Sequence, residues 1–313
     1  MKNNIFYKKV AIILAYYEGY QYIEEQLFSL ENQTYKNFDI FIFDDNSKKS
    51  LEISKLKLSK LIKNKINLFK NRENFGYTKN FLLGLSKVSE NYDYYCFCDQ
   101  DDIWLPHKIE RGISILNKHD SNLPVLYGTK TSITDSHCKK ILFNSLKITR
   151  KLCFKNALLQ NFAGGNTMMI NKSARKIIVS SLKDFFPASH DWWTYIIVCG
   201  AGGKVIYDQK ISLLYRQHNK SIMGSNKTWS KRLKRFNQIN NGIYKNYIDM
   251  NVKLLFSNYK LLSHYNRTIL EKFNNSRKSK IFGRIFLLIN SGVYRQNFLG
   301  NIIVFFYMIF KKI

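Results

Sequence analysis

The sequence predicts an α/β protein whose mostly parallel sheet has helices on both faces and is followed by a basic helical region. In the first 135 residues, short apolar segments alternate with segments of helical periodicity, a pattern typical of strands joined by crossover helices. Segments 10–16 and 38–43 are almost continuously apolar, as expected of strands that are covered on both faces. Beyond residue 224 the chain has no proline and a helical, basic pattern throughout.

The first half is expected to alternate strand and helix in order. Apolar runs that end at acidic or turn residues predict the strands, and apolar residues at helical spacing predict the helices between them. Strands are expected at 10–17, 38–45, 66–70 and 92–99, and helices at 23–30, 51–61 and 78–88.

The second half is less regular. Pro106 suits the first turn of a helix over 107–118, since a helix start needs no N–H there, and a strand is expected at 125–135. Further helices are expected at 174–182 and 191–198, and a β-hairpin at 202–218.

Composition excludes several classes of protein. A hydrophobic content of 45% with 15% aromatic residues excludes a disordered chain. The five cysteines are odd in number and lack paired metal-site spacing, so a reducing cytosolic location is expected. The apolar part of residues 1–20 is short and lacks a cleavage site, which argues against a signal peptide. The apolar segment 299–310 falls short of the roughly 20 residues that a spanning helix requires.

The positive charge is concentrated at the C-terminal end. Residues 220–313 contain 18 Lys and Arg against Asp249 and Glu271, so they contribute +16 of the net +28. Three explanations are open: attraction to anionic lipid, a solvated helical surface, or binding of nucleic acid.

Acidic residues interrupt this basic chain at the ends of two expected strands. Asp44 and Asp45 follow the second strand, and Asp99, Asp101 and Asp102 follow the fourth. Ligands of open parallel sheets bind at the carboxyl ends of strands, where carboxylates can hold magnesium or manganese. The alternative is that these acids cap helices or favour their positive ends.

Seven motifs, in this order and at this spacing, resemble the family 2 glycosyltransferases of the GT-A fold, and particularly their rhamnosyltransferase-like branch. They are VAIILAYYEG, ENQTYKNFDIFIFDDNS, NFGYTKNFLLGL, FCDQDDIWLPHKI, FAGGNTMMI, HDWW and YRQHNKSIMG, within about residues 8–224. The resemblance implies a catalytic domain over 1–224, with nucleotide-sugar binding in 8–135 and the acceptor side in 136–224. The basic region 225–313 would then be an amphipathic helical segment that associates with membrane.

The resemblance implies a donor site at the strand ends. Tyr17 and Asp45 match residues that contact the nucleotide base, and Asp99 matches the first acid of the donor-binding DxD element. Asp101, the second acid, matches a ligand of the divalent metal, Mn or Mg, that bridges the donor diphosphate. Asp102 would support it.

Further matches lie later in the chain. Asp191 of HDWW matches the catalytic base, although His190 stands where glutamate is commoner. Arg216 is implied near the diphosphate and His218 as a late metal ligand. The loop that faces the sugar or acceptor would include Gly164 and Gly165, and the acceptor wall would include Trp192 and Trp193.

These matches imply an inverting glycosyltransferase, because one base and one displacement invert the anomeric carbon. The branch favours L-rhamnose from dTDP-rhamnose, transferred to a polyprenyl-diphosphate-linked glycan in the synthesis of bacterial O-antigen or capsule. The enzyme would lie in the cytoplasm at the inner face of the membrane. A UDP-hexose donor is the alternative, and a sugar nucleotidyltransferase or a nucleic-acid-binding protein is more distant.

Overall fold

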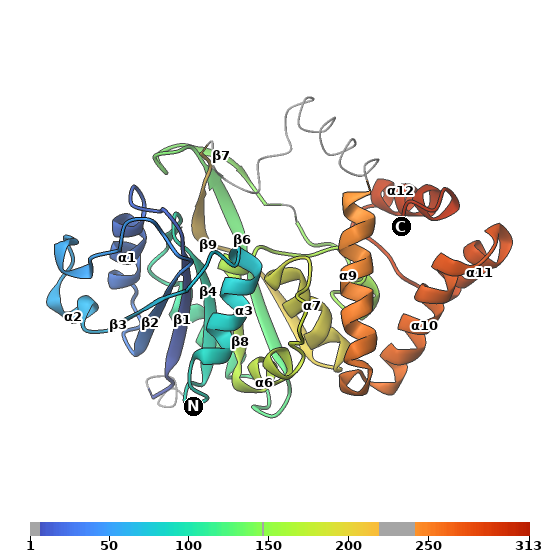
Figure 1. Cartoon of the computed structure of the whole chain (residues 1–313), viewed down its shortest axis with the longest axis horizontal. Coiled ribbons are helices and arrows are strands. Elements are labelled where there is room, and N and C mark those ends of the chain that lie inside the picture. Colours follow the sequence, from blue (N-terminus) through green and yellow to red (C-terminus); the bar gives the residue numbers. More distant parts are fainter. Residues whose placement is uncertain (1–6, 146, 219–241) are drawn as a thin grey trace.

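A computed structural model describes residues 7–145, 147–218 and 242–313, which form a mixed sheet flanked by helices (Figure 1). Its strand order is β3-β2-β1-β4-β8-β6-β9-β5, and β7 pairs with β6. The strands are β1 Val10–Tyr16, β2 Phe38–Asp44, β3 Ile66–Lys70, β4 Tyr94–Asp99, β5 Ile103–Trp104, β6 Val125–Thr134, β7 Ile141–Asn144, β8 Met169–Asn171 and β9 Lys204–Arg216.

The described helices cover both faces of this sheet and extend beyond one edge. In the first 218 residues they are α1 Ile23–Glu31, α2 Lys60–Lys63, α3 Tyr77–Lys87, α4 Lys108–Leu116, α5 Phe154–Ala157, α6 Lys172–Ser180 and α7 His190–Gly200. After residue 241 they are α9 Ile243–Ser257, α10 His264–Lys278, α11 Ile281–Ser291 and α12 Phe298–Ile309.

The predicted fold class is confirmed. Strands β3, β2, β1 and β4 are parallel neighbours, and the central strand β1 pairs along its length with β2 and β4. Residues 10–14 of β1 are buried on both faces, which explains why their sequence is continuously apolar. One hydrophobic cluster on each face of the sheet holds the helices against it.

Two predicted elements are wrong. The segment 51–61 contains only a 3₁₀ turn at Ile53–Lys55, and then Ser59 accepts a hydrogen bond from the Ile62 amide to begin the short helix α2. Leu56, between these two elements, has an extended backbone and packs against the core. Its apolar side chain is explained by this packing and not by a helix.

The predicted hairpin at 202–218 is a single strand, β9, parallel to β6. The polar sequence around Asp208 resembles a turn, but its carboxylate accepts hydrogen bonds from Tyr127 (2.9 Å) and Arg111 (3.1 Å). The extra length is absorbed by a register shift between Thr129 and Lys130 of β6. As a result β9 continues in one direction to Arg216 instead of turning back.

The C-terminal helices share a core with the first 218 residues. Apolar residues of α9 to α12 belong to the same buried cluster as α7 (Figure 1). Asn258 donates to the Ser181 carbonyl and Asn266 to the Cys199 carbonyl, each at 2.8 Å. The predicted division at residue 224 lies outside the described residues, and the buried residues of α9 belong to the same cluster as those of α7.

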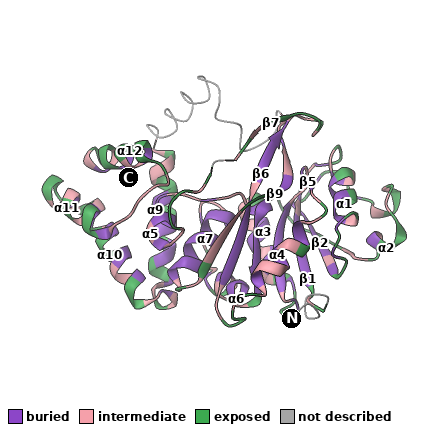
Figure 2. Cartoon of the chain, turned by 180° about the vertical axis from the view of Figure 1, so that it is seen from behind, coloured by how far each residue is buried: buried purple, intermediate pink, exposed green. Residues whose placement is uncertain are grey.

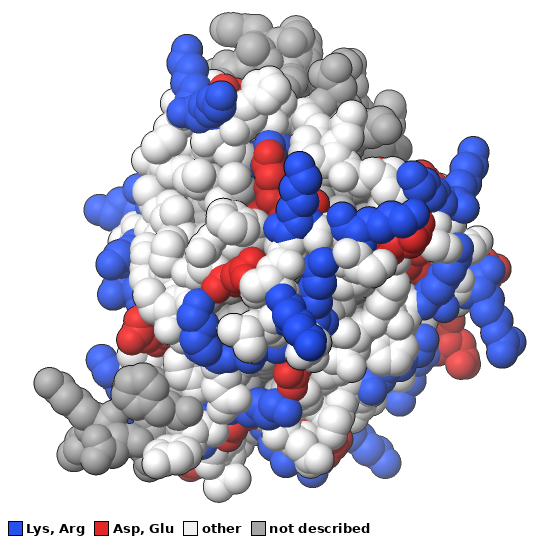
Figure 3. Space-filling view, turned by 90° about the vertical axis from the view of Figure 1, so that its left-hand side faces the viewer, with Lys and Arg blue, Asp and Glu red and all other residues white. Residues whose placement is uncertain are grey.

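The described surface mixes polar and apolar character. On the side that carries α2 and β3, Lys and Arg side chains are interspersed with Asp and Glu (Figure 3). Within the described ranges, no helix has both the length and the apolar character needed to cross a bilayer.

Candidate functional site

The carboxyl ends of β1, β2 and β4 meet at one edge of the sheet. Tyr16 of β1 pairs with Asp44 of β2, and Ala15 pairs with Asp99 of β4. The two acidic clusters expected at this edge therefore flank the end of β1, as the parallel arrangement requires.

Gln100 joins the ends of β1 and β4. Its side-chain oxygen accepts a hydrogen bond from the Tyr17 amide (2.7 Å), and its side-chain nitrogen donates to the Tyr17 carbonyl (3.1 Å). The Tyr17 side chain stays 46% exposed, so its ring is available beside the site, as the base contact would require. The sequence left two roles open for Gln100, a ligand or part of the turn that orients its neighbours, and these two bonds favour the second.

Asp45 holds the loop that leads into α3. Its buried carboxylate accepts hydrogen bonds from Asn71 Nδ2 (3.0 Å) and from the backbone amides of Phe75 (2.9 Å) and Gly76 (2.8 Å). These bonds let Asp45 position the loop before α3, and its contact with a nucleotide base stays a prediction.

Asp101 and His218 come together from segments far apart in the sequence. Asp101 Oδ2 lies 2.8 Å from His218 Nε2, and the imidazole stacks on Tyr22 with ring centroids 4.8 Å apart. These are two of the three predicted metal ligands. In the part of the chain that the structure describes, no three His, Cys, Asp or Glu side chains are grouped closely enough to hold an ion.

Asp102 and Arg216 face inward. Asp102 is fully buried and accepts hydrogen bonds from Asn166 Nδ2 and from the Arg216 amide (3.3 Å). The buried Arg216 guanidinium donates to the Asp101 carbonyl (2.8 Å) and the Ser136 carbonyl (2.7 Å) and pairs with Glu25. Arg216 therefore fixes the backbone of the turn that carries Asp101, and its contact with a diphosphate stays a prediction.

Asp191 lies in the first turn of α7. Its Oδ1 accepts a hydrogen bond from the Trp192 amide (2.7 Å), and no described residue donates a hydrogen bond to Oδ2. The carboxylate is largely buried, and the positive end of the helix favours its charge. One oxygen is thus fixed while the other is available to take a proton.

Three carboxylates repel one another here. Burial is the main cause that raises the pKa of Asp99, and the charges of Asp101 and Asp191 raise it further. A divalent cation would relieve this repulsion, and carboxylate oxygens with one imidazole are ligands that Mn²⁺ or Mg²⁺ accepts. Asp101 and His218 are therefore two side chains of suitable chemistry for such an ion, and the part played by Asp99 as a third ligand stays a prediction.

His190 fills the space between Gly165 and the helix α3. Its ring stacks on Phe81 with centroids 4.1 Å apart, and both ring nitrogens are buried without a hydrogen-bond partner among the described residues. A Cβ on Gly165 would lie only 2.1 Å from His190 Nε2. The close approach explains why glycine occupies position 165, beside Gly164, whose carbonyl accepts a hydrogen bond from the Thr167 hydroxyl (2.8 Å).

The two tryptophans of HDWW are core residues. Trp193 is fully buried and its indole N–H donates to Ser181 Oγ (2.9 Å), while the Trp192 indole donates to the Ala157 carbonyl (2.7 Å). Trp193 was predicted to form part of the acceptor wall, but a side chain without exposed surface has no face for a ligand. It instead packs α7 against the core.

The structure adds two residues to which the sequence gave no role: Asn166 and Tyr77. Tyr77 lies near the site, since burial and then the charges of Asp191 and Asp99 raise the pKa of its hydroxyl. Asparagine and tyrosine are common in this chain, so no pattern in the sequence distinguishes these two.

Comparisons with known proteins agree with this geometry. The chain is 30% identical to dTDP-rhamnosyl transferase RfbG of Shigella flexneri over 74% of this chain and 81% of that one. It is 28% identical to UDP-Glc:alpha-D-GlcNAc-diphosphoundecaprenol beta-1,3-glucosyltransferase WfgD of Escherichia coli, over 47% of this chain and 55% of that one.

The fold is similar to that in the crystal structure of S. aureus TarS residues 1–349 in complex with UDP. The TM-score is 0.50 at 13% identity, and the match covers 90% of this chain and 89% of that one, a likeness of fold alone. The fold is thus of the GT-A type, with a C-terminal helical region. The model of "Glycosyl transferase family 2" matches residues 10–178, more than half of the chain. The chain therefore belongs to glycosyltransferase family 2.

Proposed function

We propose that this protein is an inverting, metal-dependent glycosyltransferase that moves L-rhamnose from dTDP-rhamnose to a lipid-linked glycan during synthesis of a bacterial surface polysaccharide. The observation that carries the proposal is Asp191, whose Oδ2 is available at the start of α7 beside the acidic edge of the sheet. Asp101 and His218 meet on that same edge.

Asp191 is the general base. Its Oδ2 takes the proton of the attacking acceptor hydroxyl, while the Trp192 amide keeps the carboxylate oriented. Asp101 and His218, with Asp99, would hold a divalent metal, which would supply a Lewis acid for the donor diphosphate. Attack from the face opposite the leaving group inverts the anomeric carbon, because no enzyme nucleophile intervenes.

The donor assignment is supported by the rhamnosyltransferase-like motifs and by the 30% identity to a dTDP-rhamnosyl transferase. A UDP-hexose is the second candidate, supported by the similarity to a UDP-glucose-dependent enzyme. Tyr17 and Asp45 would face the nucleotide in either case, and Gly164 and Gly165 would lie beside the sugar.

The acceptor is lipid-linked and the protein binds the inner face of the cell membrane from the cytoplasm. This part of the proposal is supported by α11 and α12, whose outer surfaces are largely exposed (Figure 2). Large apolar side chains lie on that surface, among them Phe282 (86% exposed), Phe286, Phe298 and Leu299. Residues 272–313 contain eight Lys and Arg and no Asp or Glu, which suits an anionic lipid surface.

Thermal unfolding with a set of nucleotide-sugars tests the donor, since a ligand that binds the folded chain raises its melting temperature. We expect dTDP-L-rhamnose with Mn²⁺ to give the largest shift and to be hydrolysed slowly to dTDP. The Asp191→Asn variant should keep this shift and lose transfer by about 10²-fold or more. Transfer by Asp191→Asn at the wild-type rate would refute the base assignment, and a larger shift with a UDP-hexose would favour the second donor.

A further inference from the structure

An aromatic pocket of about 440 Å³ opens beside the proposed base. Three segments build it: the start of α3, the loop before α7, and α9. Its lining includes Phe75, Tyr77, Phe185, Phe186, Pro187 and Met250. Such a mainly apolar lining is typical of a ligand site and gives flat surfaces on which a sugar ring can stack.

The pocket approaches the start of α7, where Asp191 lies, through Tyr77 of its lining. The Tyr77 ring lies edge to face with His190, with centroids 6.0 Å apart, and His190 directly precedes Asp191. On the far side of the same loop, the amides of Phe75 and Gly76 bind Asp45. The 75–76 loop therefore lies between the pocket and Asp45, and Tyr77 lies between the pocket and the start of α7.

Two lysines lie on the aromatic rings of this pocket. Lys79 Nζ lies 4.1 Å from the Phe75 ring centroid and 5.5 Å from that of Phe186. Lys253 Nζ lies 4.6 Å from the Phe185 ring centroid. These ammonium groups add positive charge at the pocket, where an anionic group attached to a sugar would pass.

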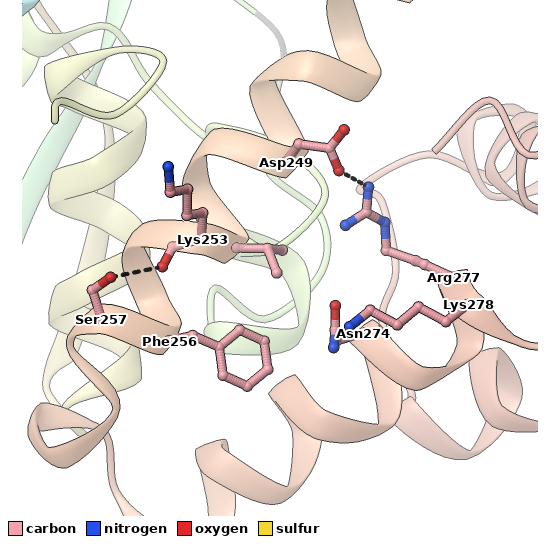
Figure 4. A pocket seen from close by; sticks show the side chains of 8 residues that line it. Asp249, Lys253, Phe256, Ser257, Asn274, Arg277 and Lys278 are labelled. Carbon is pink, nitrogen blue, oxygen red and sulfur yellow. Dashed lines mark hydrogen bonds and ion pairs between the residues drawn. The ribbon is translucent and has the colours of Figure 1, made fainter.

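Lys253 also lines a second pocket, of about 560 Å³, between α9 and α10 (Figure 4). Arg277 pairs there with Asp249, and the Lys278 side chain extends toward Asn274 in the groove. The groove thus has three basic residues against one acidic residue. Because Lys253 contacts Phe185 of the first pocket, the aromatic pocket and the basic groove adjoin.

We propose that the two pockets form one acceptor track. The aromatic pocket, with Phe186 and Met250, holds the sugar ring that presents its hydroxyl to Asp191, and the groove, with Lys253 and Lys278, holds the diphosphate that joins this glycan to its lipid. The inference rests on the proposed function and specifies where its lipid-linked acceptor binds.

Steady-state kinetics in detergent test the track. The acceptor is the glycolipid extract of a strain that lacks this gene, and the donor is dTDP-L-rhamnose with Mn²⁺. We expect Phe186→Ala and Lys278→Ala each to raise the acceptor KM about three- to tenfold, as loss of a stacking or charged contact should. Donor hydrolysis without acceptor should stay within about twofold of wild type, since neither side chain lies on the donor edge.

Matched controls separate the outcomes. Phe28→Ala, on exposed α1, and Lys272→Ala, elsewhere on α10, should leave the acceptor KM unchanged. Phe186→Leu provides a milder change if Phe186→Ala does not fold. Acceptor KM values equal to those of the controls would overturn the track. If Lys278→Ala weakened only binding to anionic vesicles, the groove would bind membrane lipid and the proposal would be wrong. Failure of the wild type to hydrolyse any donor would instead refute the proposed function.

Discussion

Substitution of Gly165 by alanine tests the packing that places Asp191. The new Cβ would lie 2.1 Å from His190 Nε2, 3.0 Å from Cε1 and 3.1 Å from Cδ2. An ordinary contact begins at 3.4 Å, so the ring or the loop must move by about 1.3 Å. The ring has little room, because it is 4% exposed and lies between Phe81 and Phe97.

The overlap should lower both the free energy of unfolding and kcat. Overpacking of a filled core destabilises by about 1–3 kcal/mol, which lowers the melting temperature of a chain of this size by several degrees. A shift of about 1 Å in a group next to the base should also lower kcat about 100-fold. Both are measurable on the same protein, by calorimetry and by transfer assay.

A double variant isolates the contact. His190→Ala removes the ring, so Gly165→Ala should cost at least about 1 kcal/mol less in that background than in the wild type. Gly283→Ala, in the interior of α11 with its nearest neighbour at 3.4 Å, is the matched control and should not destabilise. A Gly165→Ala protein with wild-type melting temperature and kcat would refute this reasoning.

Three further predictions concern the metal, the membrane and pH. Asp101→Ala should abolish the Mn²⁺-dependent thermal shift by dTDP-L-rhamnose, as EDTA should for the wild type, while the exposed Asp120→Ala keeps it; retention by Asp101→Ala would exclude its role as ligand. The double variant Phe286→Asp, Phe306→Asp should bind anionic vesicles at least tenfold more weakly in a sedimentation assay. Each Phe side chain that enters the lipid contributes about 1.5–3 kcal/mol of binding free energy. Phe28→Asp is the control, and equal binding by both proteins would argue against the membrane surface. Burial lowers the pKa of His190 from 6.5 to about 4. Since the unfolded chain then binds the proton first, the free energy of unfolding should fall by up to about 1.4 kcal/mol per pH unit as pH falls from about 6.5 toward 4. His190→Gln should reduce this slope in denaturant titrations, and an unchanged slope would contradict it.

Strand ends were predictable and side-chain directions were not. Continuous apolar runs define β1, β2 and β4, and the parallel order brings their terminal acids together. The same sequence does not tell that Asp101 faces His218 while Asp102 turns inward to Asn166, because adjacent residues in an irregular turn differ in direction without any pattern of hydrophobicity.

The failures have similar causes. The polar residues around Asp208 suggested a turn, but their hydrogen bonds to Tyr127 and Arg111 come from parts of the chain about 80 and 97 residues away. Leu254 and Leu255 of α9 are fully buried in the cluster that also contains α7, a contact that the basic composition of the last 94 residues does not reveal. Long-range contacts of this kind are absent from local periodicity.

The shared core of α7 and the C-terminal helices holds Asp191 at a fixed distance from α11 and α12. If α11 and α12 rest on the lipid, the packing through α9 and α10 sets the height of Asp191 above the headgroups. The base would then reach only those sugars that stand at that height on the growing chain. The sugar that receives the transferred group would then be selected by its distance from the membrane as well as by its fit in the site.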